Sequence, residues 1–202
     1  MMLNQKLIAA LGLTLTLGTA ALADIVGTAV VDGKKVELNS DGTWAYVEAA
    51  DSDCQTLHPI LSFCGDPDIW VSGQPPNADI IAQYRYDDRH YGQFIVEALG
   101  ANDGMSLEFM RDAVLQNAAA ASGVPVSQIE VLEVTPVELS GQSGEQIVYK
   151  VRLNGLPIVM ANSVLVSDSH TVQAMTFAIG QEYSVEHRSL NRTFMELTEL
   201  DN

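Results

Sequence analysis

The chain has 202 residues, of which 26 are acidic and 10 basic, so its formal net charge is −16 at neutral pH. This charge excludes the usual electrostatics of a nucleic-acid binder, which needs clustered Lys and Arg to neutralise phosphates. Aliphatic, aromatic and cysteine residues form 47% of the chain and charged residues 18%, which excludes a disordered acidic tail and is enough for one packed core.

The N-terminus has the layout of a secretory signal peptide. An uncharged apolar run from Leu7 to Ala23 follows Lys6, and the small residues Ala21 and Ala23 precede Asp24. This pattern predicts that residues 1–23 are a signal peptide, cleaved between Ala23 and Asp24. The alternative is an uncleaved membrane anchor, but a run of 17 residues with two glycines is at the short end for crossing a bilayer. We therefore expect a periplasmic or secreted protein with no stable membrane insertion after cleavage.

Residues 24–48 are expected to form a small β-ribbon of two or three strands. Asp-Gly turn dipeptides at 32–33 and 41–42 separate its β-rich segments. The stretch GKKVELNSDGTWAYV resembles a short element found near the ends of many exported bacterial proteins. Because an isolated ribbon is only marginally stable in water, we expect it to pack on the main domain or on a partner. Trp44 is expected to be a packing anchor of the ribbon rather than a residue that stacks on a ligand.

Residues 49–76 form a predicted connection that ends with a short strand around residues 69–72. Cys54 and Cys64 have nine residues between them, and in an oxidising compartment such a pair favours a structural disulfide. Closing this loop would stabilise the fold by about 3 kcal/mol. One alternative is a metal site built from Cys54, His58 and Cys64, with or without Asp66, and another is a redox dithiol. The spacing matches neither a common zinc pattern nor Cys-x-x-Cys.

The main domain is expected at residues 77–202, beginning with two strands and a helix. The strands are IIAQYRY, from Ile80, and QFIVEAL, from Gln93, joined by a turn at residues 87–89. Ser106 is a suitable N-cap for the helix, and Gly123 ends it. The helix is predicted from apolar residues at helical spacing, namely Leu107, Met110, Val114, Ala118 and Ala121.

Four strand-like runs follow, at residues 128–139, 145–153, 156–166 and 171–179, and a last helix is expected from about Ser184. The connections at 140–144, 154–155 and 167–170 have hairpin length, so the strands should be antiparallel neighbours. Pro136 predicts a bulge or a sheet edge within its own strand. The last helix carries an apolar stripe made by Leu190, Phe194 and Leu197.

The third and fourth of these runs are apolar on both sides, so each face of the sheet needs a cover. The two amphipathic helices can supply it. We therefore predict an α+β fold in which an antiparallel sheet of about six strands is flanked by two helices, in the order β-β-α-β-β-β-β-α. An apolar strip that the helices leave uncovered would be the natural binding groove.

This order of elements resembles the PsbP-like fold, over about residues 69–200. The resemblance also includes the segment YGQFIVEALGANDGMSLEFMRDAVLQNA, in which a hairpin strand leads through a loop into a helix. The fold is shared by a thylakoid-lumen subunit of photosystem II, a nuclear-transport cofactor that binds the Ran GTPase, and bacterial envelope proteins. The resemblance implies a non-enzymatic adaptor, chaperone or assembly factor that acts through protein surfaces. No site motif matches, so it assigns no functional residue.

The sequence contains no recognisable catalytic or cofactor motif. A Gly-rich phosphate loop, a paired-His zinc helix and a dinucleotide fingerprint are all missing, so we expect no cofactor, no metal and no catalytic residue. The four histidines, His58, His90, His170 and His187, are interpreted as ordinary polar residues. The pair at 87–88 is interpreted as a solvated turn rather than an acid and base couple.

Two function classes follow. The first is an exported, non-enzymatic binding or assembly factor that engages a protein or peptide of the cell envelope through a sheet face or edge. The second is a periplasmic hydrolase whose carboxylate and His site is assembled only in three dimensions. A hydrolase predicts a deep pocket around a His or acid with a perturbed pKa. Metal carriage through His58, His90 and nearby Asp residues is a weaker third possibility.

Overall fold

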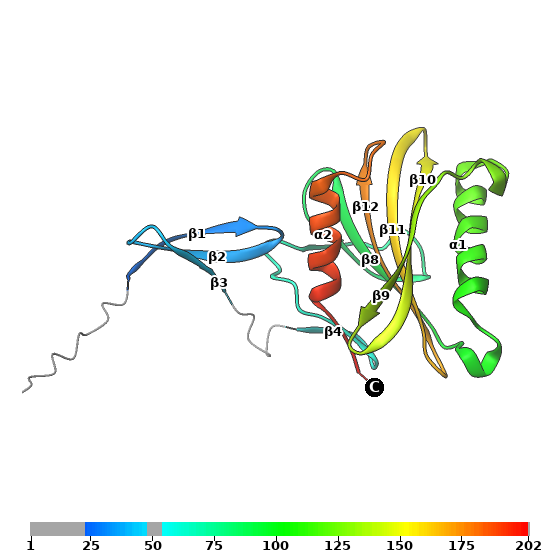
Figure 1. Ribbon diagram of the computed structural model, residues 1–202, viewed down its shortest axis with the longest axis horizontal. Coiled ribbons are helices and arrows are strands. Elements are labelled where there is room, and N and C mark those ends of the chain that lie inside the picture. The colour runs from blue at the N-terminus through cyan, green and yellow to red at the C-terminus, as the bar shows by residue number, and fades with distance from the viewer. Residues whose placement is uncertain (1–22, 48–53, 202) are drawn as a thin grey trace, which may run out of the picture.

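The computed structural model describes residues 23–47 and 54–201, which fold into three antiparallel sheets and two helices (Figure 1). Apart from Ala23, the predicted signal peptide lies outside these residues. None of the helices in this part of the chain is both long enough and apolar enough to cross a membrane. The N-terminal ribbon is a sheet in the order β1-β2-β3, formed by Ile25–Val31, Lys34–Asn39 and Trp44–Tyr46.

A central sheet of seven strands forms the main domain, in the order β6-β7-β8-β12-β11-β10-β9. The prediction of about six strands with antiparallel neighbours is thus confirmed, with the short strand β6 added at one edge. The strands are β6 (Val71–Gly73), β7 (Ile80–Arg85), β8 (His90–Glu97), β9 (Val131–Leu139), β10 (Gln142–Leu153), β11 (Leu156–Val166) and β12 (Thr171–Ile179).

Tight turns set the register of the late hairpins. Asn154 and Gly155 both have positive φ values, 53° and 81°, as a two-residue hairpin turn requires. Ser140 and Gly141 make a second such turn, with φ values of 50° and 78°. The connection predicted at 140–144 is therefore too long, because β10 already starts at Gln142. Strand β9 is an edge strand of the sheet, as Pro136 predicted.

The two helices cover opposite faces of the central sheet, as Figure 1 shows. Helix α1 spans Leu107–Ser122, and the Ser106 side chain accepts a hydrogen bond from the backbone N–H of Phe109, which confirms the predicted N-cap. Helix α2 spans Val185–Glu196 and has Ser184 as its N-cap. Because both faces are covered, the apolar residues on the two sides of β11 and β12 are buried in separate cores.

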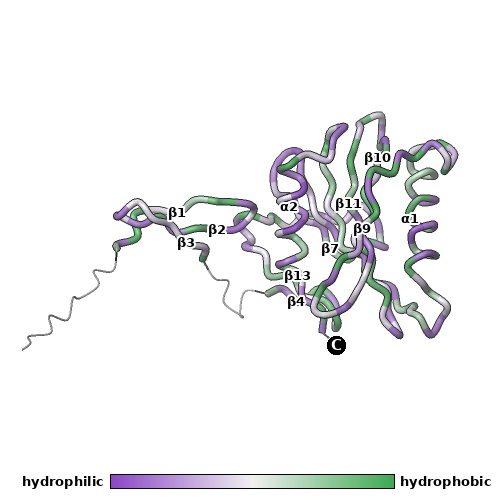
Figure 2. The backbone as a smooth tube through the Cα atoms, in the orientation of Figure 1, coloured by the Kyte–Doolittle hydropathy of each residue, from purple (hydrophilic) through white to green (hydrophobic). Residues whose placement is uncertain are grey.

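Strand alternation assigns the core residues to these two faces. The core under α1 includes Met110, Val114, Ala118, Ile147, Tyr149, Val151, Ile158, Met160 and Met175. The core under α2 includes Leu165, Val172, Ala174, Leu190 and Phe194. Figure 2 shows that hydrophobic stretches lie in the ribbon strands β1 and β2 as well as in the central sheet.

A third, small sheet closes the α2 side, in the order β13-β5-β4. Its strands are β4 (Gln55–His58), β5 (Leu61–Phe63) and β13 (Thr198–Leu200). It places Phe63 against Phe194, with ring centroids 4.9 Å apart, and Trp70 lies 5.2 Å from the same ring. Neither β4 and β5 in the connection nor the strand at 198–200 was predicted from the sequence, because strands of three or four residues are too short to show a clear period.

The ribbon is attached to the domain through the turn between β1 and β2. Thr193 donates a hydrogen bond to the carbonyl oxygen of Asp32 at 2.6 Å, and the Trp70 indole N–H donates one to that of Gly33 at 3.2 Å. Gly33 has a φ of 77°, and a Cβ there would lie 3.2 Å from Leu190, so glycine suits both the turn and the close approach to α2. The rest of the ribbon projects from the domain (Figure 1).

Candidate functional site

The exposed apolar surface is concentrated on the ribbon. Fifteen large hydrophobic residues in the described part of the chain are exposed, and seven of them belong to residues 25–47. They are Ile25, Val26, Val30, Leu38, Trp44, Tyr46 and Val47. Because soluble proteins seldom expose contiguous apolar patches without a use, this concentration marks the ribbon as a candidate interaction surface.

The most aromatic face of the ribbon is built by the pairing of β2 with β3. Leu38 lies opposite Trp44, and Val36 lies opposite Tyr46, so all four side chains share one face. The Trp44 and Tyr46 rings meet edge to face at 5.3 Å, and Trp44 is 51% exposed. Trp44 therefore packs against Tyr46 inside the ribbon, as expected of a packing anchor, and attachment of the ribbon to the domain is a separate role. That role belongs to the turn at residues 32–33, while Trp44 is presented to the outside.

A groove of 720 Å³ lies between α2 and the edge strand β9. Arg188 bridges it by donating a hydrogen bond to Glu133 at 2.8 Å, and this bond lowers the pKa of the Glu133 carboxyl. The Arg188 guanidinium also lies 4.1 Å from the centre of the Tyr183 ring. This groove is not the apolar strip that was expected on an uncovered face, because charged side chains bridge and line it.

A cavity of 370 Å³ lies on the opposite face, between α1 and the strands β8, β10, β11 and β12. Its polar wall is made of Gln93, Tyr149, Asn162 and Gln173, all of them buried. Asn162 donates a hydrogen bond to Gln173 at 2.9 Å, but its Oδ1 has no partner within the described residues. An unsatisfied buried acceptor costs about 1–3 kcal/mol, so this atom needs an explanation. Burial raises the pKa of Tyr149 to about 12, which keeps its hydroxyl neutral.

Two of the four histidines, His90 and His187, are buried. His90 Nδ1 lies 2.9 Å from Asp87, and its ring centroid is 6.0 Å from that of His187. His187 Nε2 lies 3.0 Å from the Thr176 hydroxyl, which donates to Asn191. The interpretation of His90 and His187 as ordinary polar residues is therefore wrong, and no local signal in the sequence marks either histidine as buried.

This histidine cluster gives the hydrolase alternative no support. Thr176 is buried and its hydroxyl is hydrogen-bonded to both His187 and Asn191, so this hydroxyl is not presented to a substrate. The groove and the cavity described above are lined by neither His90 nor His187. The cluster acts as a buried polar network that fixes α2 on β12.

His187 should make stability depend on pH. Burial, followed by the charge of His90, lowers its pKa from 6.5 to about 4, so the unfolded chain binds a proton at pH values where the folded chain does not. The stabilisation is therefore complete above pH 6.5 and falls by about 3 kcal/mol as the pH drops to 4. Urea unfolding at several pH values should show a smaller decline for His187→Gln than for the unaltered protein. Parallel curves would contradict this.

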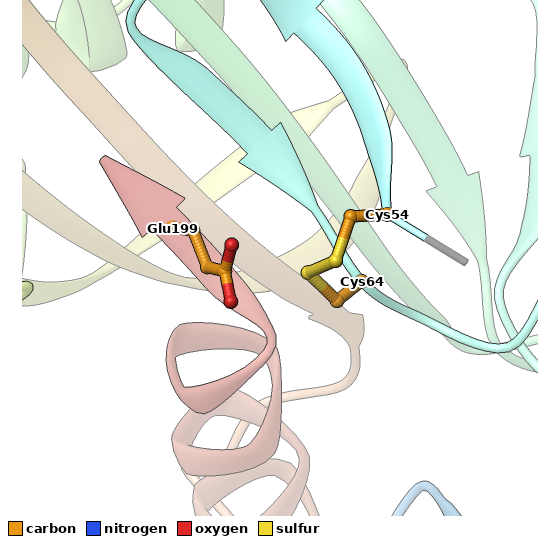
Figure 3. Close-up of side chains that lie close together, drawn as sticks. All are labelled: Cys54, Cys64 and Glu199. Atoms are coloured by element: carbon orange, nitrogen blue, oxygen red, sulfur yellow. A yellow bond between two sulfur atoms is a disulfide. The ribbon is translucent and has the colours of Figure 1, made fainter. Parts of the chain in front are cut away.

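The structure joins Cys54 and Cys64 in a disulfide that closes the β4–β5 hairpin (Figure 3). Glu199 lies beside it, but sulfurs bonded to each other are not thiolate ligands, so the Cys54, His58 and Cys64 metal alternative is not formed. The hypothesis of metal carriage through His58 and His90 is not supported, because the two histidines have different neighbours. The ring centroid of His58 is 5.8 Å from that of His170, whereas the His90 ring lies beside His187. His90 instead groups with Asp87 and the exposed Glu186.

The comparison with solved structures identifies the fold. The structure is similar to the solution structure of cyanobacterial PsbP (CyanoP) from Synechocystis, with a TM-score of 0.51 and 12% identity over 76% of this chain and 91% of that one. The fold is PsbP-like. The resemblance drawn from the order of elements is thus confirmed, and at this identity it establishes the fold alone.

Two further solved structures show weaker similarity, with TM-scores below 0.5. LpqN, described as involved in cell envelope biogenesis of Mycobacterium tuberculosis, has a TM-score of 0.46 and 17% identity over 72% of this chain and 87% of that one. PA94 from Pseudomonas aeruginosa, a protein of unknown function, has a TM-score of 0.41 and 7% identity over 85% of this chain and 94% of that one. No family model and no curated protein matches the sequence.

Proposed function

We propose that this PsbP-like chain is an exported, non-enzymatic binding or assembly factor that holds a protein partner on its N-terminal ribbon. The observation that carries the proposal is the concentration of exposed apolar side chains on residues 25–47. Transfer of this surface from water into an interface is favourable, at about 25 cal/mol per Å² of apolar area. In the main domain, by contrast, most large hydrophobic side chains are buried in the cores on the two faces of the sheet.

The geometry of the ribbon suits a protein partner. Trp44 and Tyr46 are large aromatic residues, the type that most often provides hot spots in interfaces. Both outer strands, β1 and β3, have an unpaired edge within the described residues, so an extended segment of the partner can add a further strand beside the aromatic face. The attachment of the turn at 32–33 to α2 fixes the position of this surface on the domain.

Export is the second part of the proposal and rests on the predicted cleavage between Ala23 and Asp24. Cleavage there would place the new N-terminus immediately before β1, which starts at Ile25. The disulfide between Cys54 and Cys64 supports an oxidising compartment, since such bonds persist there. The net charge of −16 supports solubility and low nonspecific affinity for anionic membranes, so recognition would depend on the apolar ribbon.

Replacing the two aromatic residues of the ribbon should remove the partner while leaving the domain folded. The double variant Trp44→Ser and Tyr46→Ser is expected to weaken partner binding at least tenfold, because hot-spot residues contribute about 2 kcal/mol or more each. Crosslinking in the intact envelope, with identification of the partner by mass spectrometry, followed by a binding assay with the purified partner, measures this loss. The free energy of unfolding should change by less than about 1 kcal/mol.

Phe109→Ser is the matched control, because Phe109 is 55% exposed but lies on α1, away from the ribbon. Its affinity for the partner should equal that of the unaltered protein. Arg188→Ala tests the α2–β9 groove in the same assay. If Arg188→Ala abolishes binding and the ribbon variant does not, the partner binds in the groove and the proposed site is wrong.

A further inference from the structure

The cavity beside α1 has the features of a small-molecule site that is separate from the ribbon. Its volume of 370 Å³ is within the range of ligand pockets. A smaller cavity of 170 Å³ adjoins it and shares Asp79, Ile95, Val114, Asn117 and Gln173 with it. Together they form one hollow along the side of α1 that faces the sheet.

The wall of this cavity consists of apolar side chains and a patch of neutral polar side chains. Met160, Met175 and Val151 are among its apolar residues, and the polar patch contains amides and a phenol but no charged group. The acidic side chains that line the hollow, Asp79 and Glu97, are not buried. A carboxylate or phosphate would be repelled by them and would find no cation among the lining residues, so the arrangement disfavours an anion.

The polar patch lacks a hydrogen-bond donor for the side-chain oxygen of Asn162. The residue is only 1% exposed and lines the cavity, its amide N–H is bonded to Gln173, and its Oδ1 is without a partner in the described part of the chain. A carbonyl oxygen in this state accepts a hydrogen bond, so the complementary group is an N–H or O–H donor. The side chains of Met160 and Met175 line the same cavity, and methionine is flexible enough to adapt its packing to a bound molecule.

We propose that this cavity binds a small uncharged molecule with an apolar body and an N–H or O–H group that donates to Asn162 Oδ1. The apolar body lies against the methionine and aliphatic residues under α1. The donor satisfies the one buried acceptor that the fold itself leaves open among the described residues of this cavity. The site does not depend on the ribbon, so the protein would have two binding surfaces on different sides of the sheet.

Three probes of equal size test the chemistry. Hexanamide offers a carbonyl and an N–H donor, 2-heptanone keeps the carbonyl but replaces the amide nitrogen by a methyl group, and hexanoate carries a negative charge. Each is titrated into the oxidised, ¹⁵N-labelled protein, and chemical shift changes give the affinity. We expect hexanamide to bind about tenfold more tightly than 2-heptanone, because only hexanamide satisfies Asn162, and hexanoate to bind most weakly. Equal affinity of hexanamide and 2-heptanone would overturn the proposal.

Two substitutions on α1 locate the site. Ala121 is exposed and lines the cavity, so Ala121→Trp should block it and reduce the affinity for hexanamide at least tenfold. Ala120 is the exposed neighbour that does not line it, and Ala120→Trp should bind hexanamide as the unaltered protein does. Equal affinity of both tryptophan variants for hexanamide would place the probe elsewhere and refute the assignment.

Asn162→Leu tests the acceptor itself. This variant should retain the affinity for 2-heptanone and lose the tenfold preference for hexanamide. General destabilisation of the fold would weaken the binding of both probes and would not change the ratio of their affinities. A preference that persists in Asn162→Leu would show that another group receives the donor, and the assignment to Oδ1 would be wrong.

Discussion

Val114→Asp is expected to lower the free energy of unfolding by about 3 to 5 kcal/mol. Val114 is 4% exposed and belongs to the core between α1 and the sheet. A carboxylate there would lose its hydration, and none of the residues in that core offers it a cation. A domain is usually stabilised by only about 5 to 15 kcal/mol, so the variant would be largely unfolded under mild conditions.

Urea unfolding of the oxidised protein measures this loss. Val185→Asp is the matched control, because it makes the same substitution at the first residue of α2, where Val185 is 85% exposed. A negative charge there is compatible with the positive end of the helix dipole, so stability should hardly change. Asp112→Ala, on the exposed side of α1, should also have little effect. Equal losses in Val114→Asp and Val185→Asp would contradict the helix assignment.

Phe194→Ala is the second substitution with a large expected effect, a loss of about 3 to 5 kcal/mol. The Phe194 side chain is fully buried, stacks on Phe94 at 4.7 Å and also contacts Phe63 and Trp70. It therefore joins α2 to β8 and to the small sheet. Its removal leaves a cavity at the point where three elements meet, and dispersion contacts are lost with all of them.

Phe109→Ala separates this effect from the general effect of losing a phenyl ring. Phe109 is 55% exposed, so its loss should change the free energy of unfolding by about 0.5 kcal/mol or less. Unfolding of the two variants in urea, at one pH and with the disulfide intact, gives the comparison. A loss in Phe109→Ala as large as that in Phe194→Ala would show that the aromatic cluster is not the centre of the α2 core.

The packing of Phe194 depends on Gly92, which no local pattern in the sequence indicates. A Cβ on Gly92 would lie 2.3 Å from the Phe194 ring, so only glycine lets the ring rest on β8. The two residues are about a hundred positions apart in the chain. The spacing of apolar residues along a helix shows that Phe194 faces inward. It does not show which distant residue Phe194 contacts, because the pattern extends over fewer than about twenty residues.

Local patterns were sufficient for the larger elements. The Ser106 cap, the stripe along α1 and the Asn-Gly turn at 154–155 were read from the sequence and agree with the structure. The same holds for the apolar residues on both sides of β11 and β12, which required a cover on each face of the sheet. These features depend on residues within about ten positions of one another, and backbone geometry fixes their spacing.

The sequence by itself determined the order of the two helices and the longer strands, the late antiparallel hairpins and the need for two helical covers, because each follows from short-range periodicity and turn chemistry. Only the tertiary structure decided that Trp44 is presented outward, that His90 and His187 are buried, and that Asn162 Oδ1 has no partner among the described residues. Burial and hydrogen-bond satisfaction depend on which distant segments meet. Both candidate binding sites therefore became visible only when the sheets and helices were assembled.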